Sequence, residues 1–193
     1  MPAASETTTK DRILDVAQQL VQARGFSGFS YADIAAKVGI RKASIHHHFA
    51  TKGVLGAELM ARYRTDFGRA LQSIEKSGGG SRSKLRKYGR LFVDVLRDGH
   101  RMCLCGMLAA DFDALPKSVR TEVSGFFDDN ETWLTRVLET GRAEGDLSFT
   151  GPVEVQAQVI LAALEGAMLV ARSYRNVKLF EAVAQRVLAG VGA

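Results

Sequence analysis

The sequence predicts an all-α protein, with an N-terminal three-helix domain that carries a helix-turn-helix motif and a larger C-terminal helical domain. The chain of 193 residues contains only three prolines. Apolar residues recur three and four positions apart along most of its length, which is the period of a helix that buries one face. Residues 30–49 show two short helical patterns separated by a glycine, the layout of a helix-turn-helix motif.

The first helix is expected over about residues 8–24, followed by Gly25. Its buried face would carry the apolar side chains of Ile13, Leu14, Ala17, Leu20 and Val21.

The second helix begins after Ser30, a good N-cap, and Asp33 can return a hydrogen bond to the Ser30 backbone. Gly39 follows the last periodic residue, where glycine adopts a left-handed C-cap at least cost. The buried positions expected in this helix and the next are Ile34, Ala35, Val38, Ile45 and Phe49. The outer face of the third helix is left with Lys42, Ser44, His46, His47 and His48, all suited to phosphates and base edges.

The fourth helix begins near Thr51 and carries an apolar stripe at four-residue spacing: Leu55, Leu59, Tyr63, Phe67 and Leu71. The run from Gly78 to Ser81 predicts a loop. Further helices are expected over about 83–97, 103–113, 116–142, 153–173 and 179–189, with Pro116 and Pro152 marking two helix starts.

The N-terminal motif resembles the TetR-type one-component transcriptional regulators. The matching positions are Ser30, Ile34 with Ala35, Gly39, Ser44, the run from His46 to Phe49, and Lys52 with Leu55. Three positions depart from the family pattern: His46 replaces a usual Tyr, Ala43 a common Gly, and Gly53 a common Glu.

The resemblance implies a helix-turn-helix DNA-binding domain over residues 1–52 and a ligand-binding and dimerisation domain over residues 53–193. It implies a repressor that binds palindromic double-stranded operator DNA as a homodimer and is released by a small-molecule inducer or by thiol modification. The DNA contacts expected are Ser30, Tyr31, Lys42, Ser44, His46, His47 and Lys52.

The segment 153–173 is apolar nearly all round between Val159 and Ala171, so two of its sides need cover. Ala162 and Gly166 are small enough for another helix to approach closely. Together with residues 179–189, this helix is expected to form the dimer interface that the resemblance implies. The alternative is a monomer in which the helix is simply buried.

The resemblance also implies an apolar ligand cavity in the second domain, and its expected wall residues are Phe92, Cys103, Met107, Phe112, Trp133, Met168 and Arg172. The aromatic and methionine side chains among them are also ordinary core residues by type. Glu165 and Arg172 stand out in an apolar run. Each is suited to a polar ligand group, or the two could pair in a dimer interface.

The two cysteines, Cys103 and Cys105, lack the further ligands that a zinc site needs, so no metal and no cofactor are expected. Two small core side chains are the plain interpretation. Cys103 also matches a thiol at the start of the sixth helix in an electrophile-sensing branch of TetR-like regulators. Neighbouring Arg101 and His100, together with the helix N-terminus, would lower its pKa. That branch often has a lysine where this chain has Arg172.

The sequence contains no glycine-rich phosphate loop, no nucleophile elbow and no His-Glu-x-x-His motif, so an enzyme is not expected. An all-helical enzyme and an architectural DNA-binding module without a ligand remain as alternatives. The net charge of +5 favours an anionic partner but also fits a solvated surface. The polar first ten residues and the interrupted apolar runs predict neither a signal peptide nor a membrane span, hence a cytoplasmic protein.

Overall fold

The computed structural model describes residues 8–99 and 101–192, and every regular element in these two ranges is helical. This confirms the predicted all-α class. The α-helices are α1 (Thr9–Arg24), α2 (Tyr31–Val38), α3 (Lys42–His48), α4 (Lys52–Lys76), α5 (Ser81–Arg97), α6 (Leu104–Ala109), α7 (Lys117–Ala143), α8 (Val153–Ser173) and α9 (Val177–Ala189), with a 3-10 turn at Phe112–Ala114.

The predicted caps of the helix-turn-helix are present. Ser30 and Asp33 form a capping box, in which the Ser30 backbone N–H donates to Asp33 Oδ2 at 2.7 Å. Gly39 adopts the left-handed conformation with φ of 77°, and its N–H donates to the Ala35 carbonyl at 2.9 Å. Ile45 and Phe49 are fully buried, so α3 is held against α1 and α2 by its inner face.

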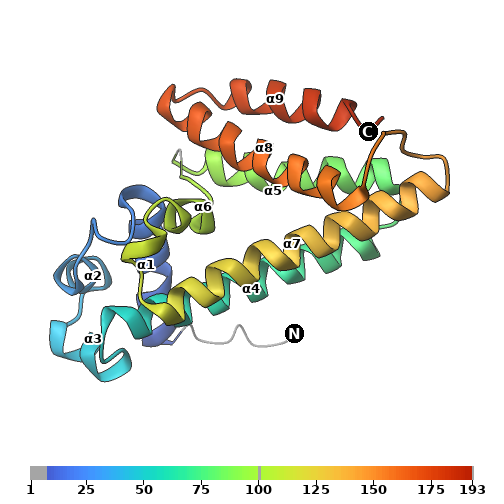
Figure 1. Cartoon of the computed structure of the whole chain (residues 1–193). Coiled ribbons are helices and arrows are strands. Elements are labelled where there is room, and N and C mark those ends of the chain that lie inside the picture. Colours follow the sequence, from blue (N-terminus) through green and yellow to red (C-terminus); the bar gives the residue numbers. More distant parts are fainter. Residues whose placement is uncertain (1–7, 100, 193) are drawn as a thin grey trace, which may run out of the picture.

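The helices α1, α2 and α3 lie at one end of the molecule, and α4 runs from them into the C-terminal helices (Figure 1). Within the C-terminal part, α4 and α7 run side by side, and α8 packs against both α7 and α9. An aromatic cluster fills the space between α4, α5 and α7: Tyr63, Phe67, Tyr88, Phe92, Phe126 and Trp133. Buried side chains form one continuous core from Ile13 to Val191, so the two ends of the chain are packed as one body.

Four boundaries differ from the expected ones. The helix expected over 103–113 is shorter, because α6 ends at Ala109 and the chain continues through the 3-10 turn. Pro116 is the N-cap of α7 rather than its first residue. At α9, the Asn176 side chain accepts from the Leu179 backbone N–H at 3.3 Å, which starts the helix two residues earlier. The start of α5 also moves forward, to Ser81, where Asp146 accepts from the Arg82 backbone N–H at 2.8 Å.

Helix α8 is long and apolar enough by composition to cross a membrane, with a mean hydropathy of 1.5. The apolar run was expected to be too short for a span because Glu165 interrupts it, and the helix as a whole is nevertheless long enough. In the structure, however, α8 lies between α7 and α9 and contributes eight residues to the buried interior. Packing within the helical bundle therefore explains one face of this apolar helix, whereas its outer face is exposed.

Candidate functional site

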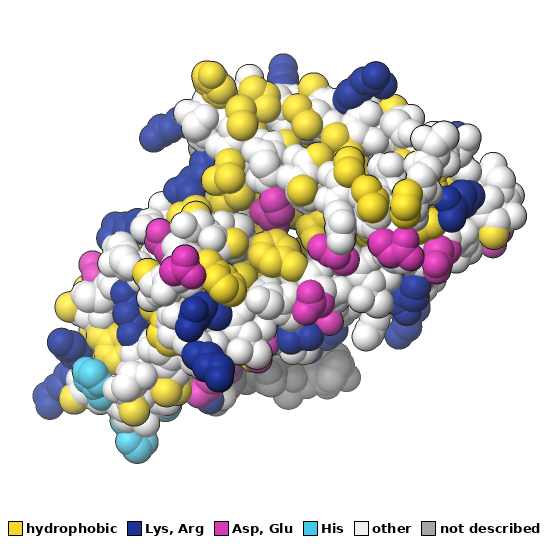
Figure 2. All heavy atoms as spheres, viewed as in Figure 1, with side chains coloured by type: hydrophobic (Ala, Val, Ile, Leu, Met, Phe, Trp, Pro, Cys, Tyr) yellow, Lys and Arg dark blue, Asp and Glu magenta, His cyan; other side chains and the backbone are white. Residues whose placement is uncertain are grey.

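The outer face of α3 carries a cluster of exposed polar side chains at the end of the molecule. Lys42, His46 and His47 are exposed, and Ser44 is half-buried. They come together because Ile45 and Phe49 anchor the opposite face of the helix in the core. Figure 2 shows the histidines gathered at this protruding end. The arrangement presents positive charge and hydrogen-bonding groups on one short helix, as readout of a DNA groove requires.

Tyr31 was expected to contact DNA, but its side chain is buried in the protein. Its side chain is 6% exposed and its hydroxyl donates to the Phe49 carbonyl at 2.9 Å. Burial raises the pKa of this phenol. The ring also packs against His46, with ring centres 4.8 Å apart. Tyr31 therefore joins α2 to the end of α3 and orients His46, instead of presenting its hydroxyl to a phosphate.

Lys52, also expected to bind phosphate, points back into the protein. Its ammonium group donates to the Phe29 carbonyl and lies 4.0 Å from the centre of the Phe29 ring and 5.0 Å from that of Phe26. Partial burial lowers its pKa. The lysine thus fixes the loop between α1 and α2 to the start of α4.

Ser30 is exposed, but its hydroxyl is used within the capping box with Asp33. Two exposed cations near the motif were not among the expected contacts. Arg41 is the N-cap of α3 and Lys37 lies on α2, and neither forms an ion pair within the described part of the chain. In the sequence, Arg41 directly precedes Lys42 in the turn. Two adjacent cations at the start of this helix could have identified Arg41 as a further DNA contact.

Two hydrogen bonds tie the end of α1 to α8 and to the segment just before α6. The Gln22 side chain is buried and donates to the Met102 carbonyl at 3.0 Å, just before α6. Arg172 on α8 donates to the Ala23 carbonyl at 2.7 Å and also contacts the Met107 sulfur. These bonds connect α8 and the segment before α6 to the end of α1, against which α2 packs.

A groove of about 420 Å³ lies where α6, α7 and α8 meet. Its walls are mostly apolar and include Met102, Phe127, Leu161 and Leu169. Glu131 and Gln158 lie at its margin, where the Gln158 amide donates to Glu131 at 3.2 Å. The size and the apolar lining match those of small-molecule sites.

Glu165 from α8 lines this groove, and its two carboxylate oxygens are buried with no hydrogen-bond partner among the described residues. Burial raises the pKa of the carboxyl well above its ordinary value, and the neighbouring Cys103 adds to this effect. A Cβ placed on Gly106 would meet Glu165 Oε2 at 2.5 Å. Glycine at this position of α6 therefore makes room for the carboxyl group.

Cys103 is the N-cap of α6, as expected for the start of this helix, but it is only 2% exposed. Its sulfur lies 3.8 Å from the Tyr63 hydroxyl. Burial by itself would raise the pKa of the thiol. The polar groups around the sulfur, which are Cys105, Glu165, the Gly106 N–H and Tyr63, outweigh burial and lower the pKa to about 6.

One expected cause of the lowered pKa is found, because the Gly106 N–H belongs to the first turn of α6. Arg101 forms an ion pair with Asp98 at 2.7 Å, and it does not figure among the groups that shift the pKa of Cys103. His100 lies outside the described residues.

Comparison with known proteins agrees with this architecture. The family described as "Bacterial regulatory proteins, tetR family" matches residues 13–59, and the description "Tetracyclin repressor-like, C-terminal domain" matches residues 82–187. The chain belongs to the TetR family. The resemblance inferred from residues 30–55 is thereby confirmed and extends over the C-terminal helices.

Curated relatives of this TetR-family chain are transcriptional regulators. It is 26% identical to the repressor NemR of Escherichia coli strain K12, over 92% of this chain and 90% of the relative. It is 30% identical to the transcriptional regulator AcuR of Cereibacter sphaeroides, over 77% of this chain and 69% of the relative.

Solved TetR-family structures share the whole fold. A regulator from Agrobacterium tumefaciens has a TM-score of 0.91 at 37% identity, covering 94% of this chain and 96% of its own. The reduced form of E. coli NemR has a TM-score of 0.83 at 25% identity, covering 95% of this chain and 97% of its own.

The seven residues expected to line a TetR-type ligand cavity do not line the apolar groove. Phe92, Cys103, Trp133 and Met168 are at most 3% exposed and belong to the closed core. Met107 and Arg172 are engaged with each other, while Phe112 lies on the 3-10 turn, near the Arg120 guanidinium. Core and wall positions share the same residue types and spacing, so the sequence could not separate them.

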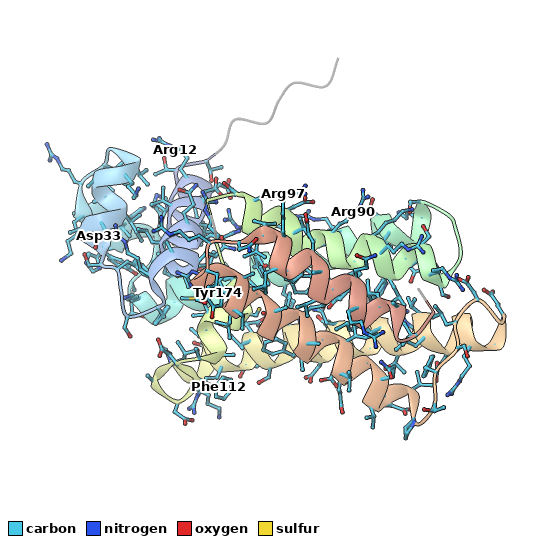
Figure 3. All side chains as sticks on the ribbon, turned by 90° about the horizontal axis from the view of Figure 1, so that it is seen from above. Arg12, Asp33, Arg90, Arg97, Phe112 and Tyr174 are labelled. Atoms are coloured by element: carbon cyan, nitrogen blue, oxygen red, sulfur yellow. The ribbon has the colours of Figure 1, made fainter. Side chains whose placement is uncertain are left out.

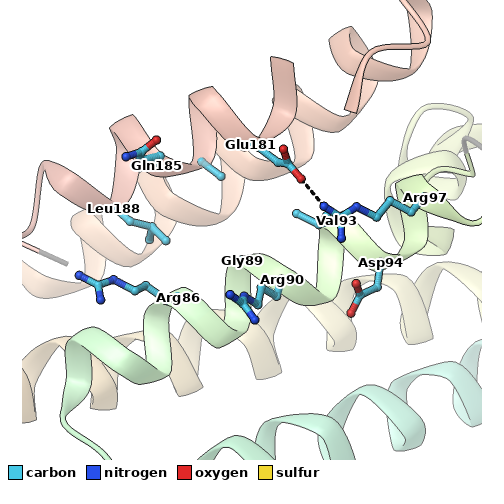
Figure 4. A pocket seen from close by; sticks show the side chains of 10 residues that line it. Arg86, Gly89, Arg90, Val93, Asp94, Arg97, Glu181, Gln185 and Leu188 are labelled. Atoms are coloured by element: carbon cyan, nitrogen blue, oxygen red, sulfur yellow. Dashed lines mark hydrogen bonds and ion pairs between the residues drawn. The ribbon is translucent and has the colours of Figure 1, made fainter. Parts of the chain in front are cut away.

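A second hollow, of about 590 Å³, lies between α5 and α9 and is lined by Arg86, Arg90 and Arg97 (Figure 4). Arg97 pairs with Glu181 at 2.7 Å, and the three arginines are exposed. Arg90 and Arg97 lie along the outer edge of α5, away from the α7 side of the bundle (Figure 3). This face is therefore well solvated, in contrast to the groove that contains Glu165.

The outer faces of α8 and α9 expose several large apolar side chains of this TetR-family chain. Those at least one-third exposed are Val155, Val159, Leu169, Val170 and Val183, with Tyr174 at the corner between the helices. Figure 2 shows hydrophobic side chains gathered over these helices. A Cβ at Gly166 would meet nothing within 4 Å, so the centre of this face is open.

Proposed function

We propose that the chain is a cytoplasmic transcriptional repressor that binds a palindromic operator as a homodimer and releases it when a small molecule binds the C-terminal helices. The observation that carries the proposal is the exposed α3 surface on a TetR-family fold. The relatives named as repressors support the direction of regulation.

The proposed DNA contacts are Lys42, Ser44, His46 and His47 on α3, with Arg41 added beside them. These side chains are exposed or half-exposed, and together they combine phosphate-binding charge with groups that read base edges. Ser30, Tyr31 and Lys52 are assigned supporting roles, because their polar atoms already have partners inside the protein.

The proposed dimer interface is the exposed apolar face of α8 and α9. A water-exposed row of valines and leucines on two adjacent helices is unfavourable in a monomer and is typical of an interaction surface. A two-fold axis through this face would place two α3 helices on successive half-sites, about 34–36 Å apart. Sedimentation of a monomer at micromolar concentration would contradict the interface.

Release is proposed to pass from α6 and α8 to α1. The Gln22 and Arg172 hydrogen bonds connect these elements directly. A ligand that favours another position of α6 would change the placement of α3 on DNA. The ligand-bound state must have the lower affinity for the operator, since a ligand with equal affinity for both states shifts nothing.

The first experiment is fluorescence anisotropy on the duplex upstream of the gene itself, at about 150 mM salt, because affinity for DNA depends on salt. A scrambled duplex of equal composition and a Lys42→Ala variant serve as controls. We expect tight binding of the wild type to the natural duplex only, and weaker binding of the variant. Equal weak binding of the wild type to both duplexes would reject sequence-specific binding to this operator.

Thiol modification is the second proposed route of release. The lowered pKa of Cys103 and its place at the start of α6 support it, and a solved relative is described as a reduced form. A Cys103→Ser protein should keep operator binding but resist release by N-ethylmaleimide, whereas Cys105→Ser, which keeps a hydroxyl beside the Cys103 sulfur, should still be released. Unchanged release of Cys103→Ser would reject this route.

A further inference from the structure

The groove between α6, α7 and α8 contains a buried acid that nothing in the described part of the protein neutralises. Both oxygens of Glu165 are inaccessible to solvent and unpartnered within the described residues. A buried carboxyl group without a hydrogen bond is unfavourable in free energy, so native proteins seldom keep one without a use. The groove that Glu165 lines provides space for the missing partner.

The charge of the groove indicates what that partner is. No lysine, arginine or histidine is among the described residues that line it, whereas Glu131 and Glu165 are. Figure 2 shows acidic side chains along the border of the hydrophobic patch on this face, with basic side chains at its end toward the helix-turn-helix. An anionic ligand would meet no donor cluster, while a protonated nitrogen would stabilise the ionised form of Glu165, whose pKa is raised in the free protein, in an apolar setting where the attraction is strong.

Local packing keeps the carboxyl group in this position. Gly106 leaves the space that Glu165 Oε2 occupies, and a side chain at residue 106 would displace it. Arg172, the nearest arginine along α8, is engaged with Ala23 and Met107 and does not pair with Glu165. The acid is therefore held at the contact between α6 and α8, beside the groove, without a counter-ion from the described residues.

We propose that this groove binds a small ligand with an apolar body and a protonated amine, and that Glu165 is the group that receives the amine. The assignment rests on the proposed function, because it names the class of inducer for the same helices. The groove of about 420 Å³ accommodates an arylalkylamine, with the aromatic part against Phe127 and Leu161, while Leu169 and Gly166 at its edge are shared with the proposed dimer interface. Binding here contacts Met102 and Gly106, which places it next to the Gln22 hydrogen bond to α1.

The test uses matched probes on the full-length protein. The probes are 3-phenylpropylamine, 3-phenylpropan-1-ol and 3-phenylpropanoate, titrated by ligand-observed NMR at pH 7.5. We expect the amine to bind with a Kd on the order of 0.1–1 mM, given the affinity typical of ligands this small. It should bind roughly 10-fold more tightly than the alcohol, as a charge-assisted hydrogen bond implies, and the carboxylate should bind weakest.

Two variants test whether the preference for the amine depends on Glu165. Glu165→Gln keeps the shape and should bring the amine to the affinity of the alcohol. Glu154→Gln removes a charge from an exposed position on the same helix and should keep the wild-type preference. Circular dichroism melting verifies that both variants are folded. Gly106→Ala, which displaces the carboxyl, should also reduce amine binding.

Equal binding of amine and alcohol by the wild type, no amine binding up to about 5 mM (well above the affinity typical of such ligands), or an amine preference that survives in Glu165→Gln would overturn the proposal. If Glu165→Gln instead weakens the dimer in sedimentation without changing amine binding, the partner of Glu165 is a second subunit.

Operator anisotropy with the same proteins distinguishes failure of the proposed repressor function from failure of the proposed amine site. If the wild type does not bind the operator, the proposed repressor function is rejected. If the amine binds without releasing DNA, only the link between the groove and operator binding is rejected.

Discussion

The position of Lys52 leads to a prediction that separates structural support from DNA contact. Its ammonium group donates to the Phe29 carbonyl and lies over the rings of Phe26 and Phe29. Lys52→Met keeps an apolar stem and removes these interactions. A hydrogen bond from a charged donor contributes about 1.5–3 kcal/mol and an exposed cation–π contact about 0.5–1 kcal/mol. Because the group is only partly buried, the lower ends apply, and we expect a loss of about 2 kcal/mol.

The melting temperature should then fall by about 4–8 °C, at 2–4 °C per kcal/mol for a chain of this size. The protein concentration must be held fixed, because the stability of a dimer depends on it. The slope of log K against log salt for operator binding should stay at the wild-type value. If Lys52 instead neutralised a phosphate in each of two subunits, its replacement would make that slope shallower by about 1.8.

Lys42→Met is the matched control, since Lys42 is exposed on α3. This variant should melt like the wild type and show the shallower slope. The opposite pattern for Lys52→Met, an unchanged melting temperature with a shallower slope, would refute the structural role and restore Lys52 as a phosphate contact.

Three further predictions concern the helix-turn-helix and its link to α6. Tyr31→Phe leaves the Phe49 carbonyl unpaired and should cost about 1–2 kcal/mol in urea unfolding, with operator affinity unchanged; weaker DNA binding at unaltered stability would contradict this. Hydrogen bonds from Ser30 lower the pKa of Asp33, so its ionised form stabilises the fold, and that stability is lost as the pH falls. Asp33→Asn should therefore be less stable than the wild type at pH 7, and the difference should narrow below about pH 4, whereas a constant difference would exclude the ionised cap. Gln22→Ala leaves the Met102 carbonyl unpaired and should cost about 1–3 kcal/mol, and it should also weaken inducer release; full stability with normal release would rule out this link.

Most of the helix-turn-helix could be predicted from the sequence because its determinants are local. The capping box of Ser30 and Asp33 and the left-handed Gly39 depend on residues only a few positions apart. The burial of Ile45 and Phe49 follows from helical spacing in the same way. The helix boundaries that shifted, such as the end of α6, depend on contacts with the rest of the fold.

Local sequence patterns could not assign the candidate binding sites. Tyr31 and Lys52 are polar residues in a DNA-binding motif, and only the tertiary structure places Phe49 and Phe29 beside their polar atoms. In the same way, Glu165 is conspicuous in the sequence, but its lack of a partner among the described residues and its place in a groove depend on three helices that meet there. The sequence alone determined the helical class, the motif and the family, because periodicity and caps act over short range. The tertiary structure decided which polar groups remain free to bind DNA or a ligand, because hydrogen bonds between distant segments use up the others.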